Sequence, residues 1–277
     1  DRFSKSRFEI CSMVATNDCI AKNIFDNTYG SLQSGLAGIL SLTNLQIPSS
    51  KVVVAGYGRV GEGVAKSMKA LGAEVIVTEI ASIPALKAKL EGFSVMPMAE
   101  AIKIGDLFIT ATGCCDVITT DHLLYAKDNA VFCNIGHFDN EIDVAGLQTL
   151  TGDKGFSIRE GLTQYILNVK VSTTDPNNPD DVTEKILQKR INILADGRLV
   201  NLAGNNLGHP VETMDISFSA QYLALLILQA NEEKLTDIKD VILLQDSISE
   251  SICATKLSTL GVKLDLLTDK QKQYLGA

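Results

Sequence analysis

The chain has 277 residues, of which 45% are hydrophobic and 21% charged, and its formal net charge is −8 at pH 7. A chain of this length buries a full hydrophobic core in one or two domains. The negative charge, which no basic patch offsets, argues against binding along a nucleic-acid backbone. No apolar run reaches the about 20 residues that cross a bilayer, so we expect no membrane partner.

The six cysteines show no C-x-x-C spacing, and the three histidines are scattered along the chain. We therefore predict no metal site, and we expect reduced thiols, most of them buried, in a cytoplasmic protein. Cys114 and Cys115 are adjacent, a spacing that seldom allows a disulfide, so packing is the expected role of both. The first residues lack an initiator Met and an apolar signal segment, which is typical of a fragment or a processed product.

In chain order, residues 12–47 contain two helical patterns, which we interpret as the neck of a second domain. The apolar, β-branched run 51–55 then leads directly into Gly56, Gly58 and Gly61, spaced G-x-G-x-x-G. The first glycine permits a tight turn, and the second lets the backbone approach a pyrophosphate. The third lets the following helix pack closely on the strand.

A helical pattern from Val60 to Leu71 follows the glycines. Its start, near Arg59 and Val60, would present free N–H groups and the positive end of the helix dipole to phosphates. The next strand pattern, 74–78, ends at Glu79, about 20 residues beyond the glycines. A carboxylate there accepts both ribose hydroxyls of NAD and repels the extra phosphate of NADP. We therefore expect NAD, with a plain glycine turn as the alternative, although Arg59 in the loop speaks for NADP.

Strand and helix patterns alternate from there onward. We expect strands over 93–96, 106–112 and 130–135, and helices over 84–90, 98–104 and 120–126. Such alternation predicts an α/β protein with a doubly wound parallel sheet of the Rossmann type, flanked by helices of a partial second domain. Ligands of such sheets bind beyond the C-terminal strand ends, where Thr112, Gly113, Asn134, Gly136 and His137 fall.

The patterns after Thr151 are weaker. Residues 172–181 are polar and rich in turn formers, so we expect a surface loop there. The runs 191–194 and 199–202 flank Asp196 and Gly197, which predicts a β-hairpin. The remaining patterns predict a helix over 213–230, a strand over 241–244, and helices over 249–260 and 268–274.

Several separate strings resemble one family, the S-adenosylhomocysteine hydrolases (adenosylhomocysteinases). They are the segment from Asn17 to Gly30, V-A-G-Y-G at 54–58, T-E-I at 78–80, N-I-G-H-F-D at 134–139, G-R-L-V-N-L at 197–202, G-H-P at 208–210 and Q-Y-L-G at 273–276. The likeness covers nearly the whole chain. The string N-I-G-H-F-D is particularly specific, because ordinary dehydrogenases have none like it.

The resemblance implies reversible hydrolysis of S-adenosyl-L-homocysteine to adenosine and L-homocysteine, with NAD as a cofactor that is regenerated in each turnover. In that family the ribose 3′-hydroxyl is oxidised to a ketone, which makes the C4′ proton acidic. Homocysteine then leaves by elimination, water adds, and the ketone is reduced again. The family also implies a homo-oligomer.

The same resemblance implies roles for single residues. Lys22 would be the base at the 3′-hydroxyl, beside the carboxylate of Asp26 and supported by Asn27. Asn17 and Ser31 would lie near the nicotinamide. The imidazoles of His137 and His209 would face the sugar and the leaving group. The positions expected to hold NAD are Gly56, Gly58, Arg59, Val60, Gly61, Glu79, Thr110, Ala111, Thr112, Ile135, Gly136, Asn201 and His209.

We accordingly expect residues 1–48 to be a helical hinge portion of the substrate domain, 49–210 to be the NAD-binding domain, and 211–277 to be a C-terminal helical part of the catalytic domain. The family's long N-terminal segment, which supplies most of the substrate-binding half, and its C-terminal tail are missing here. Competence as an isolated hydrolase is therefore not expected. The loop around Pro176 and one extra residue before His209 also depart from the family.

Other interpretations stay open. Lys22 and Asp26 are also an i, i+4 pair, which on most helices is a solvated ion pair worth about 0.3–0.5 kcal/mol. In the segment that follows T-E-I, Pro84 stands where the family has an Asn that holds the adenine ribose. The loss of that amide favours a non-catalytic NAD-binding paralogue. A 2-hydroxy-acid dehydrogenase is a third alternative, and it requires an arginine and a His–carboxylate pair that the sequence does not reveal.

Overall fold

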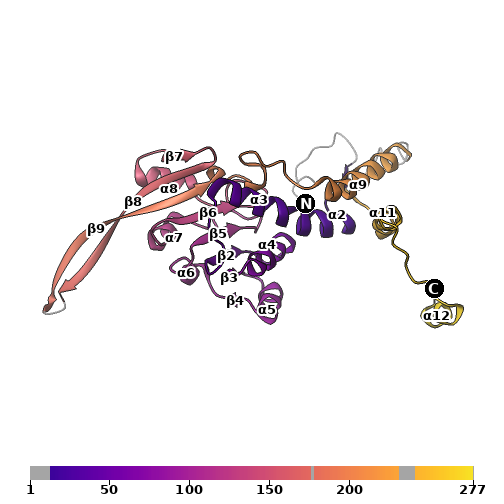
Figure 1. The fold of residues 1–277 in the computed structure, drawn as a ribbon, viewed down its shortest axis with the longest axis horizontal. Helices are drawn as coiled ribbons and strands as arrows, with labels where there is room; N and C mark the ends of the chain where they lie inside the picture. Colours follow the sequence, from indigo (N-terminus) through magenta and orange to yellow (C-terminus); the bar gives the residue numbers. More distant parts are fainter. Residues whose placement is uncertain (1–12, 176–177, 231–240, 277) are drawn as a thin grey trace. The chain divides into compact units, whose positions relative to one another are not determined.

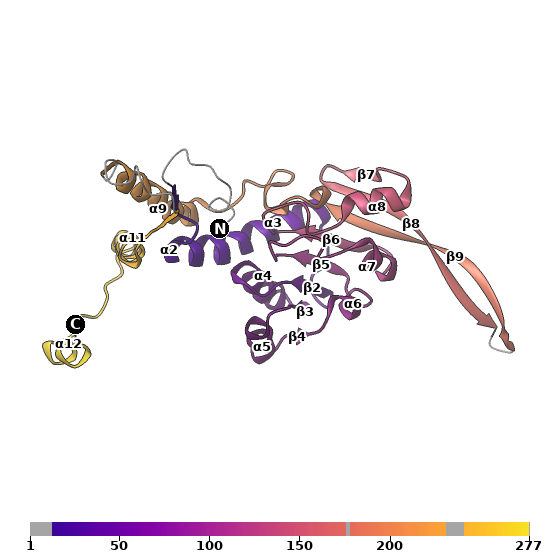
Figure 2. The same ribbon diagram turned by 180° about the vertical axis from the view of Figure 1, so that it is seen from behind.

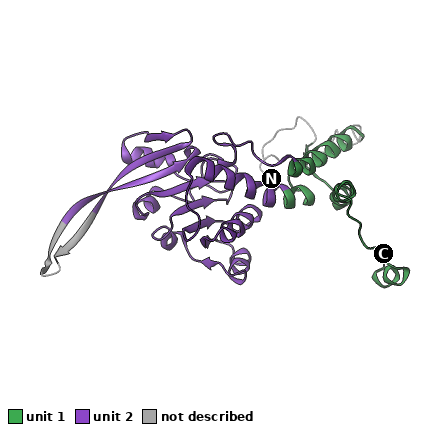
Figure 3. Cartoon of the chain, in the orientation of Figure 1, with its two compact units in different colours: residues 1–25, 212–277 green, residues 26–211 purple. Residues whose placement is uncertain are grey.

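The structure, a computed structural model, describes residues 13–175, 178–230 and 241–276. It divides into two compact units, one of residues 26–211 and one of residues 1–25 together with 212–277 (Figure 3). The larger unit contains the glycine-rich segment.

Within the described residues, the larger unit is built on an eight-stranded sheet with the order β4-β3-β2-β5-β6-β9-β8-β7 (Figure 1). Its strands are β2 (Lys51–Ala55), β3 (Glu74–Thr78), β4 (Ser94–Val95), β5 (Leu107–Thr110), β6 (Ala130–Asn134), β7 (Phe156–Arg159), β8 (Leu162–Asp175) and β9 (Asn178–Leu194). Neighbours from β4 to β9 are parallel, whereas β9, β8 and β7 pair antiparallel. The order runs outward in both directions from β2 and β5, which confirms the doubly wound α/β sheet.

Helices cover both faces of this sheet. They are α3 (Ser31–Thr43), α4 (Arg59–Ala70), α5 (Ser82–Leu90), α6 (Met98–Ala101), α7 (Thr120–Tyr125) and α8 (Val144–Thr151). Because successive side chains of a strand point to opposite faces, β2 contributes Val52 and Val54 to one hydrophobic core and Val53 to another. The first core includes side chains of α3, α4 and α5, and the second includes side chains of α6, α7 and α8.

Two sequence predictions in the C-terminal half of this unit are wrong. The run 191–194 pairs with β8 rather than with 199–202, and it is followed by 3₁₀ turns over Ala195–Gly197 and Val200–Leu202. Leu199, which a hairpin would have paired with this run, forms a parallel bridge with Asn134 instead. The polar stretch 172–181 belongs to β8 and β9 up to Asp175 and again from Asn178, and only 176–177 lie outside the described residues.

A long two-stranded ribbon explains the second error. β8 and β9 stay paired from Leu162 opposite Leu194 to Thr174 opposite Val182, well beyond the part of β9 that pairs with β6 (Figure 2). Main-chain hydrogen bonds between two strands do not require apolar side chains, so a polar composition is compatible with strand structure here.

The smaller unit joins segments from the two ends of the described chain. It consists of β1 (Met13–Ala15), α2 (Ile20–Ile24), α9 (Val211–Ala230), β10 (Val241–Leu243), α11 (Asp246–Thr259) and α12 (Asp269–Leu275). β1 pairs in parallel with β10, and a small core contains Cys19, Ala21, Ile216, Ala220 and Ile252. A π-helical turn, Phe25–Gly30, follows α2 and leads into α3.

Helix α9 corrects one expectation. By length and composition alone it is long and apolar enough to cross a membrane, contrary to the expectation that no segment would be. One such helix is weak evidence for a membrane span, since the core helix of a soluble protein passes the same test. Only 22% of its most apolar window is buried, and Phe218, Tyr222 and Leu225 are all more than half exposed.

The contact between α3 and the Val200–Leu202 turn generates a prediction. A Cβ added at Gly38 would overlap the main-chain carbonyl oxygen of Val200, which cannot move like a flexible side chain. Gly38→Ala should therefore lower the free energy of unfolding by about 1–3 kcal/mol, despite the better helix propensity of Ala. Urea unfolding followed by circular dichroism measures this in a chain that has no Trp.

Gln33→Ala on the exposed side of the same helix is the matched control, and it should change the stability by no more than about 0.5 kcal/mol. Equal stability of the Gly38 variant and this control would show that α3 and the turn do not pack as closely as described.

Candidate dinucleotide site

The glycine-rich turn has the geometry that each glycine was expected to provide. Gly56 has a φ of +91°, in the region that favours glycine. A Cβ at Gly61 would overlap the carbonyl oxygen of Gly56, so the start of α4 lies directly against the end of β2. Around Gly58 a Cβ would meet no atom within 4 Å, which leaves open space where a pyrophosphate could approach. These features fit a dinucleotide.

Glu79 lies beside this turn, at the end of β3. Its carboxylate accepts hydrogen bonds from the main-chain N–H of Tyr57 at 2.7 Å, of Ile80 at 2.8 Å and of Ala81 at 3.0 Å. The acid at the second strand is therefore held against the glycine-rich turn, as a ribose acceptor requires. The side chain of Tyr57 points elsewhere, since its hydroxyl donates to Glu91 at 2.6 Å.

The ends of β5 and β6 are joined by buried polar groups. The hydroxyl of Thr110 donates to Oδ1 of Asn134 at 3.0 Å, and the same Oδ1 accepts the N–H of Gly136 at 2.7 Å. The amide of Asn134 donates to the carbonyl oxygens of Phe138 at 2.7 Å and Gly197 at 3.1 Å. Thr110 and Asn134 thus shape the strand ends with fully buried side chains, so these two residues could meet a cofactor only through their backbone.

The sequence patterns did not reveal Glu141. This fully buried carboxylate accepts hydrogen bonds from the N–H of Thr112 at 2.9 Å, its hydroxyl at 2.7 Å, and the N–H of Gly113 at 2.7 Å. A Cβ at Gly136 would overlap Oε1 of Glu141, so the carboxylate links the turns that follow β5 and β6. The sequence signal that could have pointed to Glu141 is its place as an acid directly before the apolar Ile142, shortly after the N-I-G-H-F-D string.

His209 and Asp26 come together although 183 positions separate them. The Nδ1 atom of His209 lies 3.3 Å from Oδ1 of Asp26, and its Nε2 lies 3.4 Å from the hydroxyl of Ser31. The His209 and Asp26 side chains are 19% and 9% exposed. Asp26 belongs to the π-helical turn and Ser31 begins α3, so this segment positions both partners of the imidazole.

A second contact holds the same region in place. The amide of Asn201 donates to the hydroxyl of Ser34 at 2.6 Å, and the amide of Asn206 donates to the carbonyl oxygen of Ser34 at 2.6 Å. The Oδ1 atom of Asn201 is buried and has no hydrogen-bond partner among the described residues. An orphaned acceptor beside α3 fits a site that binds a further polar group.

Four other predicted residues lie elsewhere. In the smaller unit, Nζ of Lys22 on α2 donates to Oδ1 of Asn17 at 2.8 Å, which unites two members of the predicted catalytic set. Asn27 is half-buried on the π-helical turn of the larger unit. His137 is exposed, with its ring at 86° to that of Phe138 and 4.5 Å between the centroids.

The cysteines depart from the expected burial. Cys19 and Cys133 are buried, as predicted, but Cys114 and Cys115 are both exposed, so the packing role assigned to them is wrong. Gly113 at a φ of +69° and Asp116 at +52° turn the chain outward after β5 and carry the two thiols to the surface.

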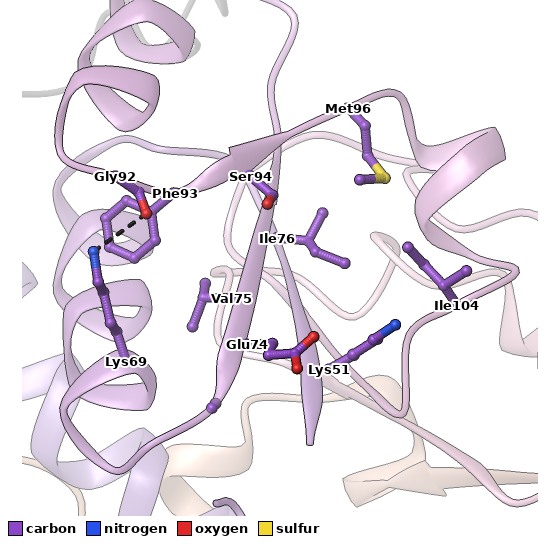
Figure 4. A pocket seen from close by; sticks show the side chains of 11 residues that line it. Lys51, Lys69, Glu74, Val75, Ile76, Gly92, Phe93, Ser94, Met96 and Ile104 are labelled. Carbon is purple, nitrogen blue, oxygen red and sulfur yellow. Dashed lines mark hydrogen bonds between the residues drawn. The ribbon is translucent and has the colours of Figure 1, made fainter. Parts of the chain in front are cut away.

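A separate cavity of about 360 Å³ lies at the N-terminal ends of β2 and β3, opposite the strand ends that carry the glycine-rich turn (Figure 4). Lys51 and Glu74, the first residues of β2 and β3, line it together with Lys69 and Phe93. Nζ of Lys69 lies 4.6 Å from the centre of the Phe93 ring. Because ligands of a doubly wound sheet bind at the other ends of the strands, this cavity is not the dinucleotide site.

The sheet order, the glycine-rich turn and the acid after β3 together define a dinucleotide-binding α/β domain of the Rossmann type. Residues 27–208 match the family model described as "S-adenosyl-L-homocysteine hydrolase, NAD binding domain". The chain belongs to this family, and NAD is the cofactor of its larger unit.

Individual relatives agree with this assignment. The adenosylhomocysteinases of Saccharolobus solfataricus and Thermotoga maritima are each 44% identical over 263 residues, which is 95% of this chain and 58% and 60% of theirs. The S-inosyl-L-homocysteine hydrolase of Methanocaldococcus jannaschii is 44% identical over 260 residues, 94% of this chain and 57% of its own. This chain therefore spans a little over half the length of the relatives it matches.

Among solved structures, a dipicolinate synthase from Bacillus subtilis is 20% identical, with a TM-score of 0.44 over 50% of this chain and 46% of that protein's. A similarity at that level adds nothing to the assignment.

The buried carboxylate yields a test of the loop after β5. Glu141→Gln replaces one acceptor oxygen by an NH₂ group and leaves a donor of Thr112 or Gly113 facing another donor. The loss of such a bond to a buried charged group should cost about 1–3 kcal/mol of folding stability, measured by urea unfolding. Asp139→Asn, an exposed acid in the same segment, is the control and should be nearly neutral. If the Glu141→Gln protein were as stable as the control, Glu141 would not hold the turns after β5 and β6 together.

Proposed function

We propose that the complete protein hydrolyses S-adenosyl-L-homocysteine reversibly to adenosine and L-homocysteine. The observation that carries the proposal is the extent of the similarity. The NAD-binding model matches 27–208, but the adenosylhomocysteinases stay 44% identical over 95% of the chain. The likeness thus includes segments outside the cofactor domain, where the predicted catalytic Asn17 and Lys22 lie.

The chemistry needs a base at the ribose 3′-hydroxyl. NAD, when bound, would take up a hydride from the 3′ carbon and return it at the end of the cycle. Lys22 would receive the hydroxyl proton, and the contact with Asn17 supports this role because an amide oxygen holds the amine in place in either protonation state. An amide also adds no net charge to the site.

His209, Asp26 and Ser31 form the second group that the proposal uses. The carboxylate of Asp26 fixes the imidazole of His209 through Nδ1, which leaves Nε2 to exchange a proton with Ser31 or with a bound hydroxyl. We assign this group to the sugar side of the site. His137, exposed near the strand end, and Asn27 complete the proposed catalytic set.

A second substrate is supported by a specific observation. The S-inosyl-L-homocysteine hydrolase of Methanocaldococcus jannaschii matches this chain at the same 44% identity as the adenosylhomocysteinases. The shared part of these proteins therefore does not separate a substrate with an adenine base from one with a hypoxanthine base. Adenosine and inosine are accordingly both needed as probes.

The dehydrogenase alternative gains one element from the structure, because His209 and Asp26 are a His–carboxylate pair that the sequence did not reveal. Family membership argues against it, since the matched relatives are hydrolases. The non-catalytic paralogue differs from the proposal only in activity, and the same experiment decides between them.

We further propose that residues 1–48 and 211–277 belong to a substrate domain and 49–210 to the NAD-binding domain. Support for the outer parts of this division comes from the smaller unit, residues 1–25 and 212–277, which exposes several large apolar side chains. Its α9 exposes Phe218 and Tyr222, and its C-terminal part exposes Leu264, Leu266 and Tyr274. Apolar faces of this kind need a cover, which the additional length of the relatives or another subunit of a homo-oligomer would supply. The unpaired thiols of the described residues are in keeping with a cytoplasmic location.

Glu79 provides the test of cofactor choice. Glu79→Ala removes the acceptor of the ribose hydroxyls and should weaken NAD binding by about 10–100-fold, measured by equilibrium dialysis. The loss of negative charge should weaken NADP binding far less, so the preference for NAD over NADP should shrink. Glu74→Ala, at the exposed start of the same strand, should leave both affinities unchanged. Equal loss for the two cofactors would mean that Glu79 only supports the turn.

Lys22 provides the test of the reaction. The complete protein, loaded with NAD and mixed with adenosine or inosine, should show NADH absorbance at the rate of 3′-oxidation. Lys22→Ala should slow this step by about 10²–10⁴-fold while NAD binding persists. Lys256→Ala, which removes the partly buried partner of the exposed Asp215 in the same unit, is the control. Binding of NAD without NADH in the unaltered protein would establish the non-catalytic paralogue.

A further inference from the structure

The two exposed thiols lie on a short loop that is fixed at both ends. On one side, the N–H groups of Thr112 and Gly113 donate to the carboxylate of Glu141. On the other, the N–H of Asp116 donates to the carbonyl oxygen of Asn140 at 2.9 Å. Cys114 and Cys115 stand between these anchors and are both exposed. The chain thus presents two neighbouring thiols on a preorganised loop.

This loop also borders the glycine-rich turn. A Cβ at Gly56 would lie 3.0 Å from the carbonyl oxygen of Ala111 and 3.1 Å from Cγ2 of Thr112, so the residues before the cysteines pack against the first glycine. The N–H of Cys114 donates to the hydroxyl of Thr112 at 3.0 Å. Thr112 therefore contacts both the thiol-bearing loop and the first glycine of the dinucleotide site.

A direct disulfide is a poor product for this pair. Adjacent Cα atoms across a trans peptide lie about 3.8 Å apart, whereas disulfides usually join Cα atoms about 4.4–6.8 Å apart. The negative charge of Asp116 and the neighbouring Cys114 also raise the pKa of the Cys115 thiol, which reduces the thiolate that an oxidant attacks. A larger atom that bonds to both sulfurs relieves the restriction on the Cα–Cα distance, because the two sulfurs then need not bond to each other.

We propose that Cys114 and Cys115 are a bidentate capture site for trivalent arsenicals and that its occupation hinders NAD binding. With an organic arsine oxide the reaction balances without an oxidant. Two S–H bonds and the As=O bond break, two As–S bonds form, the two protons leave with the oxygen as water, and arsenic stays trivalent. This site is distinct from the proposed hydrolase chemistry, and its chemical test does not depend on that activity.

The probe is phenylarsine oxide, added to the 277-residue chain, with bound arsenic counted by intact-protein mass spectrometry. We expect one adduct that survives an excess of a monothiol and is released by a dithiol, because only a chelated arsenic resists exchange with single thiols. Cys115→Val should abolish this resistant adduct, and Cys114→Ser should do the same. Both positions are exposed, so neither change should disturb folding.

Cys19 and Cys253 are the rival pair, since both belong to the core of the smaller unit. Cys253→Ser is therefore the control and should retain the resistant adduct. Loss of the adduct in this variant, or its persistence in Cys115→Val, would overturn the assignment.

Equilibrium dialysis with NAD then tests the second part of the proposal, that an occupied thiol pair hinders NAD binding. The arsenical should weaken NAD binding at least about tenfold in the unaltered chain and not in Cys115→Val. An adduct with unchanged NAD affinity would show that capture occurs but is not coupled to the cofactor site. A chain that binds the arsenical but never NAD would count against the cofactor assignment and leave the capture result intact.

Discussion

The turns at the cofactor-binding ends of the strands depend on one buried carboxylate. An unpaired carboxylate removed from water costs several kcal/mol, and Glu141 avoids that cost because hydrogen-bond donors of Thr112 and Gly113 converge on it. The same group abuts Gly136, where any side chain would displace it. The turns after β5 and β6 are therefore set by each other, and the position of Thr112 against Gly56 extends the constraint to the glycine-rich turn.

A second constraint acts between α3 and the Val200–Leu202 turn. Gly38 allows the helix to approach the carbonyl oxygen of Val200, and the amides of Asn201 and Asn206 bond to Ser34. Because α3 starts at Ser31, directly after the turn that carries Asp26, this packing delivers His209 to both residues. The proposed proton-transfer group is thus a product of helix packing, and it forms within the larger unit.

The smaller unit bears on the proposed function through its exposed apolar side chains and its predicted catalytic residues. A cofactor domain alone supplies an oxidant but no substrate pocket, and the chain spans a little over half the length of the relatives that it matches. Aromatic and aliphatic side chains of α9 and of residues beyond Thr259 are exposed in this unit. Lys22 and Asn17 lie in this same unit, whereas the glycine-rich turn lies in the larger one.

Local sequence patterns are enough to specify the class of the fold, the strands β2 and β3, and the cofactor, because continuous apolar, β-branched runs and a glycine spacing are local signals. The family's strings are also local. The same patterns do not specify the β8–β9 ribbon, whose polar composition resembles a loop, or the exposure of Cys114 and Cys115. Burial of Glu141 and the pairing of His209 with Asp26 were decided by the tertiary structure alone, since each depends on which distant segments meet, and no local pattern records that.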